Sequence, residues 1–305
     1  MARAVAVLAW IGAVLLADGV QALDGVEAWR QAVLGLGTWL VLAALLRGET
    51  ALVRTQTLVV VALATCVEYT FSPLLQAYVY RIGTVPPFVP PGHGLVYLAA
   101  LTLGRSRAFG AAPRLLSWAT AAVGGAWALA GLVGVVGGRH DVLGAFWFAC
   151  LAGFLLWGPN RRLYVGAFVV VSYLELVGTA LGTWAWAATD PVLHVVGQGN
   201  PPSGAAGGYG WFDLWALLLA PRLLALTRRR DARPLAAGVP GPASGEAPLV
   251  EDTLGPAQSS RARISASVSA VDSKASPPST PANSSALTAL RAITFSSMVS
   301  RATSR

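Results

Sequence analysis

Residues 163–187 read LYVGAFVVVSYLELVGTALGTWAWA, and this stretch indicates the fold class most clearly. Its 25 residues are almost wholly apolar, and Glu175 is the one charged side chain among them. About 20 consecutive apolar residues are enough for an α-helix to cross the hydrocarbon core of a bilayer. The stretch is therefore typical of a membrane-spanning helix.

Seven further apolar runs occur in the chain, at 3–22, 31–46, 55–80, 88–104, 114–137, 141–158 and 207–227. Only 12% of the 305 residues are charged, against 55% that are hydrophobic. Soluble domains carry about 25% charged residues, so an ordinary soluble enzyme and a nucleic-acid-binding domain are excluded despite the net charge of +8. The sequence predicts an all-α, polytopic membrane bundle of about eight transmembrane helices.

The first run has two interpretations. Arg3 before an apolar stretch and the small residues of Val20-Gln21-Ala22 are compatible with a cleaved secretory signal. A single arginine is a short basic region, however, and the run has a counterpart later in the chain. We expect a retained helix, with cleavage as the alternative.

The arginines predict the orientation, because positive residues gather in cytoplasmic loops. They cluster after the second, fourth, sixth and eighth runs, at Arg47 and Arg54, at Arg105, Arg107 and Arg114, at Arg161 and Arg162, and at Arg222, Arg228, Arg229 and Arg230. We therefore expect a multi-pass plasma-membrane protein with both termini in the cytoplasm.

The same four-helix unit occurs twice in the sequence. Arg54 and Arg161 are each followed fourteen residues later by a glutamate, Glu68 or Glu175. After each glutamate come two aromatic residues spaced by one, and then a double proline with a glycine. An even number of spans per unit makes the two repeats parallel. The alternative is chance similarity among helices of like composition.

The organisation is then a first repeat at 1–110, a second repeat at 111–230 and a tail at 231–305. The tail is rich in Ser, Ala and Pro and poor in large apolar residues. Such a segment buries too little apolar surface to order itself. We expect it to be disordered and cytoplasmic, with Arg228, Arg229 and Arg230 binding anionic lipid headgroups.

Glu68 and Glu175 are the strongest functional candidates. Each lies about 21 Å along its helix from the arginine at the helix start, beyond the middle of the membrane. Charged residues at that depth face a protein interior or a wet cavity and frequently carry function. We expect the two carboxyls to act as acid and base. The structural alternative is a pair of glutamates that only holds helices together.

Other candidates surround these two carboxyls. The rigid, apolar loop Val85–Gly94 is predicted to enter the bundle and to bring His93 near Glu68 as an acid or base. Gly178 and Gly182 are expected on one helix face, where they allow close helix packing. Asp213 is a third intramembrane carboxylate, and we expect it to share the cavity of the two glutamates as a catalytic group. The predicted substrate-binding side chains are aromatic: Tyr78, Tyr80, Tyr97, Trp184, Trp186 and Tyr209.

The run from Glu175 through Gly178, Thr179 and Gly182 to Trp184 and Trp186 resembles the Glu-xx-Gly-Thr…Gly-x-Tyr-x-Tyr pattern of bacterial and archaeal carotenoid hydratase membrane proteins. The match covers about a dozen residues. Here the aromatic residues are Trp, and the Pro-Phe-Gly step usual in that family is missing. The resemblance implies acid-catalysed addition of water to a terminal isoprenoid double bond, with Glu175 or Glu68 as the proton donor.

Three functions remain open on the sequence alone. The first is a membrane-embedded enzyme that acts on a lipid or isoprenoid. The second is a transporter built from repeats, which binds a proton or cation at Glu68 and Glu175. The third is a non-catalytic membrane scaffold. The sequence predicts no cofactor, no metal site and no nucleic-acid partner; membrane lipids and a hydrophobic small-molecule substrate are the expected partners.

Overall fold

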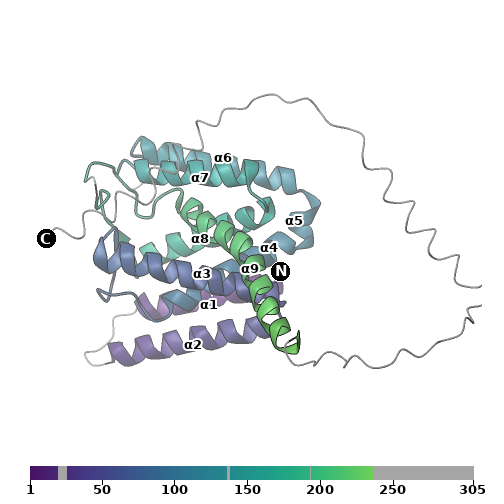
Figure 1. Ribbon diagram of the computed structural model, residues 1–305. Helices are drawn as coiled ribbons and strands as arrows, with labels where there is room; N and C mark the ends of the chain where they lie inside the picture. The colour runs from purple at the N-terminus through teal and green to yellow at the C-terminus, as the bar shows by residue number, and fades with distance from the viewer. Residues whose placement is uncertain (20–25, 136–137, 193, 237–305) are drawn as a thin grey trace, which may run out of the picture. The chain divides into compact units, whose positions relative to one another are not determined.

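The structure is a computed structural model that describes residues 1–19, 26–135, 138–192 and 194–236. It is a helical bundle with one small sheet, as the all-α prediction requires (Figure 1). The predicted tail lies outside the described residues beyond residue 236, as do the side chains of Arg228, Arg229 and Arg230.

The elements follow one another along the chain in the following order. They are α1 (Ala2–Gly19), α2 (Glu27–Arg47), α3 (Ala51–Tyr69), the π-helical turn η1 (Thr70–Leu74), β1 (Tyr78–Tyr80), α4 (Val89–Arg105), α5 (Arg107–Ala111), α6 (Pro113–Leu132), α7 (Val142–Trp157), α8 (Arg161–Ala180), β2 (Trp184–Trp186) and α9 (Ala205–Ala236). A helix occupies each of the eight predicted apolar runs. The helix α9 continues past residue 230, where the tail was expected to begin.

Within the described residues, six helices are long and apolar enough to cross a membrane. They are α1, α2, α3 with η1, α6, α8 and the part of α9 up to Thr227. The helices α4 and α7 are shorter, with 17 and 16 residues. Trp29, Trp118 and Trp157 are exposed on the surface of the bundle. Long apolar helices with large apolar side chains on their outer surface are typical of an integral membrane protein.

The central helices are α3, α4, α8 and α9, with α6 and α7 on one side and α1 and α2 on the other (Figure 1). Glycines allow the closest helix approaches in this core. A Cβ atom placed on Gly166 of α8 would lie 2.3 Å from the carbonyl oxygen of Ala100 on α4. A Cβ on Gly207 of α9 would lie 1.8 Å from the carbonyl oxygen of Trp147 on α7.

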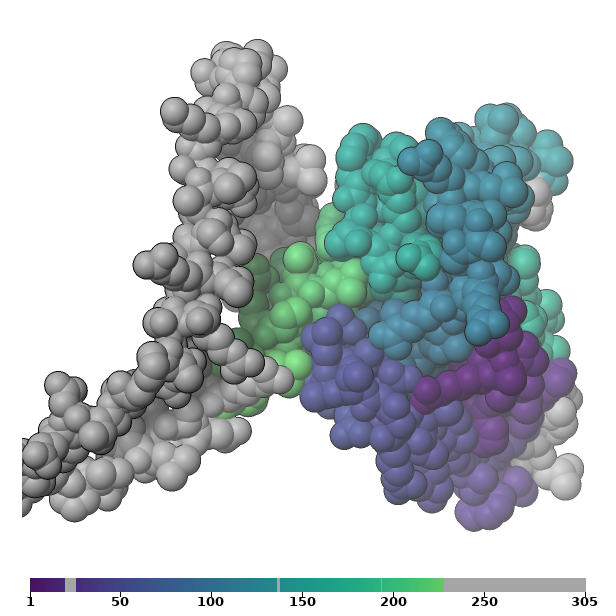
Figure 2. Space-filling model, turned by 90° about the vertical axis from the view of Figure 1, so that its right-hand side faces the viewer, coloured from purple at the N-terminus to yellow at the C-terminus, as the bar shows by residue number. Residues whose placement is uncertain are grey.

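The arginine-bearing helix ends gather at one end of the bundle, which faces the viewer in Figure 2. Glu49, between α2 and α3, is paired there with Arg3 at 2.6 Å and with Arg105 at 3.5 Å. A Cβ on Gly104 would lie 2.8 Å from the carbonyl oxygen of Arg162. The loops that carry the predicted cytoplasmic arginines therefore lie together.

The sheet lies at the opposite end, and it corrects two of the predicted spans. The runs 55–80 and 163–187 were expected to be helical throughout, but the helices end at Leu74 and Ala180, and the aromatic pairs form strands. Pro73 within η1 has no N–H group to extend a helix, and Gly182 takes a φ of +71° just after α8. Strands β1 and β2 pair antiparallel, with Tyr78 opposite Trp186 and Tyr80 opposite Trp184.

Candidate functional site

The carboxyl group of Glu68 lies in the protein interior near the end of α3, where β1 and α4 meet it. Tyr78 and Tyr80 both donate their hydroxyl hydrogens to Oε2, at 2.8 and 2.7 Å. Nε2 of His93 lies 2.8 Å from the other oxygen, Oε1. Period-two spacing on β1 turns both tyrosines to the same side of the strand. The hydroxyls thus converge on one carboxylate, and the expectation that His93 lies near Glu68 is confirmed.

Glu175 is held in the same manner at the end of α8. Trp184 and Trp186 each donate the indole Nε1–H to Oε2 at 3.0 Å. The indole of Trp184 packs directly on Gly178, where a Cβ would lie 1.9 Å from the ring. The expected role of Gly178 and Gly182 in helix packing is wrong, because Gly178 makes room for Trp184 and Gly182 is a turn residue beyond the helix.

The pairing of β1 with β2 joins the two halves into one cluster. The rings of Tyr78 and Trp186 lie 4.6 Å apart, and those of Tyr80 and Trp184 lie 6.1 Å apart. Tyr78 donates to Glu68 and Trp186 donates to Glu175, so the contact between these two rings links the two carboxyls. We call this cluster the glutamate pair site; its members are Glu68, Glu175, His93, Tyr78, Tyr80, Trp184, Trp186 and Tyr209.

Tyr209 of α9 closes the glutamate pair site from a third direction. Its ring stacks on His93 with centroids 5.2 Å apart, and Phe212 meets the same imidazole edge-on at 5.8 Å. Burial, followed by the charge of Glu68, raises the pKa of the Tyr78 and Tyr80 phenols well above their ordinary value. Both tyrosines therefore remain protonated hydrogen-bond donors at neutral pH.

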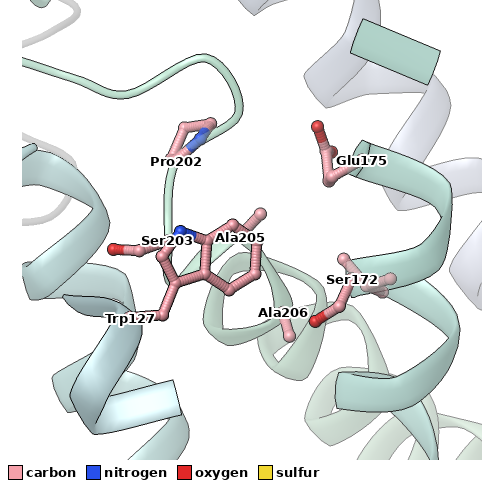
Figure 3. Close-up of a pocket in the computed structure, with 8 residues that line it drawn as sticks. Trp127, Ser172, Glu175, Pro202, Ser203, Ala205 and Ala206 are labelled. Carbon is pink, nitrogen blue, oxygen red and sulfur yellow. The ribbon is translucent and has the colours of Figure 1, made fainter. Parts of the chain in front are cut away.

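A narrow crevice lies beside Glu175 between α6, α8 and the start of α9 (Figure 3). Trp127 and Ser203 line its opposite side, and the hydroxyl of Ser203 points away from Glu175. Both indoles bind Oε2 of Glu175. The hydroxyl of Ser203 is buried and has no partner among the described residues. In this structure the crevice is too narrow to hold a water molecule.

Asp141 shapes the wall of this crevice. Its carboxylate accepts hydrogen bonds from the backbone N–H groups of Gly144, Gly199 and Ser203, at 2.9, 2.7 and 2.6 Å. It thereby caps α7 and fixes the loop that precedes α9. Asp141 stands at the start of an apolar run, a usual position for a helix cap, but the distant loop residues gave no sequence signal.

Two of the predicted site residues lie elsewhere. Tyr97 is one helical turn from His93 on α4, and its hydroxyl donates to Gln56 at 3.0 Å. Asp213 is one turn from Tyr209 on α9, makes no side-chain hydrogen bond with the glutamate pair site and does not line the crevice. The catalytic role expected of Asp213 stays a prediction.

Comparisons with known proteins identify no relative. No protein-family model, curated protein or solved structure matches the chain. Among the described residues, no three His, Cys, Asp or Glu side chains are grouped to hold a metal ion. The class of protein is thus defined by the fold and the site: a helical integral membrane protein with two aromatic-bound carboxyls in its interior.

Proposed function

We propose that the protein is a membrane-embedded enzyme that uses Glu68 and Glu175 as acid and base on a hydrophobic substrate. The main support for this proposal is that each glutamate accepts two hydrogen bonds from aromatic side chains of the sheet formed by β1 and β2. The arrangement points the polar edges of Tyr and Trp rings at two proton-transfer groups. Aromatic faces attract cations, so a carbocation that lies over one of these rings would be stabilised there.

The substrate class that fits best is an isoprenoid with a terminal double bond. One glutamate, as the acid, transfers its proton to the less substituted alkene carbon and leaves a tertiary cation on the other. A water molecule adds to this cation, and its surplus proton returns to a carboxylate. The resemblance of residues 175–186 to carotenoid hydratases supports the same reaction. The crevice is too narrow for either reactant, so the water and the isoprenoid chain are expected to enter through a movement of the surrounding helices.

The hydrogen bonds at the glutamates favour an enzyme over the other two functions. A cation carrier needs oxygen atoms that face the ion. Here Tyr hydroxyls and Trp N–H groups point their hydrogens at the carboxyls, and a cation would meet those hydrogens. A scaffold gains nothing from two buried carboxyls and an imidazole, because apolar side chains would fill the same space at lower desolvation cost.

The geometry also supports a 4+4 duplication, in which α1–α4 correspond to α6–α9. Glu68 and Glu175 both lie toward the ends of α3 and α8, and β1 and β2 follow the two glutamates at nearly the same distance. Eight spans with both termini in the cytoplasm of a plasma-membrane protein complete this proposal. Reporter domains fused to the two termini would test it: protection of either terminus from a cytoplasmic protease contradicts the orientation.

The experiment that tests the enzymatic proposal starts with the small molecules that copurify in mild detergent, identified by mass spectrometry and visible absorption. The protein is then assayed in liposomes with an acyclic polyene in ¹⁸O-labelled water. The wild type should give a product heavier by one labelled water molecule. Glu68→Gln and Glu175→Gln should abolish the product.

Glu49→Gln is the matched control, because Glu49 is a well-ordered carboxylate at the arginine end of the bundle, far from the reaction. It should leave turnover unchanged. Wild-type turnover in both Glu68→Gln and Glu175→Gln would refute the acid–base proposal. Proton flux into vesicles that needs both glutamates, in the absence of any product, would establish the carrier instead.

A further inference from the structure

Among the buried polar atoms that have no hydrogen-bond partner in the described part of the chain, three lie on neighbouring helices of the core. They are Nδ1 of His93 on α4, Oδ2 of Asp213 on α9 and the hydroxyl of Tyr164 on α8. Tyr164 is fully buried and Asp213 is 4% exposed. An unpaired buried polar group costs roughly 1–3 kcal/mol, so buried groups of this kind are usually satisfied by ordered water.

The helices arrange these atoms at successive depths. On α4, Tyr97 follows His93 by four residues, and on α9, Asp213 follows Tyr209 by four, a step of about 6 Å in each helix. His93 stacks on Tyr209. One turn deeper, Tyr97 and Asp213 occupy the corresponding positions on the same two helices.

Two further side chains extend this line toward the arginine end of the bundle. Tyr164 lies eleven residues before Glu175 on α8, about 16 Å along the helix. Its ring stacks on Phe154, which packs edge-on against Trp211 of α9, two residues before Asp213. Gln56 lies twelve residues before Glu68 on α3, about 18 Å, and accepts the hydroxyl of Tyr97. Beyond them, Arg105 is paired with Glu49.

We propose that buried water molecules complete this line and make it a water and proton relay to Glu68. We call it the polar file; it consists of Gln56, Tyr164, Tyr97, Asp213 and His93. A water molecule between Tyr164 and Asp213 accepts the phenolic hydrogen and donates to Oδ2. The next water molecules bridge the single turn from Asp213 to Nδ1 of His93, whose Nε2 already contacts Glu68.

The polar file gives the glutamate pair site a connection to water that does not pass through lipid. The crevice at Glu175 lies on the other half of the site, so the polar file would supply Glu68 independently. This inference goes beyond the proposed function, because it requires only the Glu68–His93 contact and holds for any substrate. Its first test uses no substrate, so its failure is distinguishable from failure of the enzymatic proposal.

The test is hydroxyl-radical footprinting of the full chain in liposomes, in ¹⁸O-labelled water, with mass spectrometry of each residue. Radicals form from bound water, so a buried ring beside an ordered water molecule is oxidised and acquires the label. Tyr164 and Tyr97 should be labelled. Phe168, buried on the same helix as Tyr164, is the matched control and should not be labelled.

Asp213→Leu should lower the labelling of Tyr164 by about tenfold, the change in water occupancy that a loss of roughly 1.4 kcal/mol produces. Should that variant fail to fold, Tyr164→Phe serves instead, with the labelling of Tyr97 as the readout. Labelling of Tyr164 no greater than that of Phe168 would overturn the proposal.

The connection to His93 is tested by water-edited solid-state NMR of the protein labelled with ¹⁵N-histidine. The chain has three histidines, and His140 and His194 are exposed. A water cross-peak at the buried His93 ring, weakened by Asp213→Leu, is the expected result. Cross-peaks from His140 and His194 without one from His93 would show that the polar file stops short of the glutamate pair site.

Discussion

Gly178→Ala should detach Trp184 from Glu175. The new Cβ would lie 1.9 Å from the indole ring, whereas carbon atoms in contact are about 3.5 Å apart. The ring must therefore move by about 1.6 Å, which is enough to break its 3.0 Å hydrogen bond to Oε2. The overpacking and the lost bond to a carboxylate should lower the free energy of unfolding by about 1–3 kcal/mol.

Unfolding by SDS in mixed micelles measures this change, and the indole N–H resonance of Trp184 reports the hydrogen bond. Gly208→Ala is the matched control, because Gly208 also lies in a helix and a Cβ there meets nothing within 4 Å. The control should be neutral or more stable by about 0.5–1 kcal/mol. Equal stability of the two variants, with an unshifted Trp184 resonance, would refute the packing of Trp184 on Gly178.

Three further predictions concern the supports of the site, each measured by the same unfolding assay. Asp141→Ala removes the acceptor of three backbone N–H groups and should cost about 3 kcal/mol; a loss below about 0.5 kcal/mol would contradict its role. Tyr80→Phe removes one hydrogen-bond donor to Glu68 and should lower the free energy of unfolding by about 1.5–3 kcal/mol. A variant as stable as the wild type would contradict this role of Tyr80. Arg81→Gln leaves the buried Asp18 with one hydrogen-bond donor fewer and should lower the free energy of unfolding by about 1 kcal/mol. The buried Arg81–Asp18 pair, rather than the exposed Arg81–Glu27 pair, should account for this loss, so added salt should change it little.

The sequence predicted well what depends on composition along a single helix. Each of the eight apolar runs became a helix, because a chain in lipid must satisfy its backbone hydrogen bonds within each segment. The glutamates were predicted as interior residues because an unpaired charge is too costly to expose to lipid. The placement of His93 beside Glu68 followed from the rigid loop before α4.

The ends of the helices were predicted less well, because the local sequence does not show what the next segment will pair with. The residues Tyr78 and Tyr80, like Trp184 and Trp186, continue an apolar run and were expected to be helical. Their strands form only because β1 and β2, about a hundred residues apart, supply each other's backbone hydrogen bonds. Tyr164 and Gln56 were missed for a similar reason, since the sequence does not show which side chains of other helices lie beside them, such as Tyr97 beside Gln56.

The amino-acid sequence was enough to predict a helical membrane protein and to single out Glu68 and Glu175 as its interior carboxyls. These features depend on hydrophobicity and on the cost of burying charge. The packing of the helices shows which donors bind each carboxyl and that the surroundings of Glu68 and Glu175 form one site. It also shows that Asp213 makes no side-chain hydrogen bond with that site. Those features depend on contacts between segments far apart in the chain, and their geometry is fixed only when the four central helices pack together.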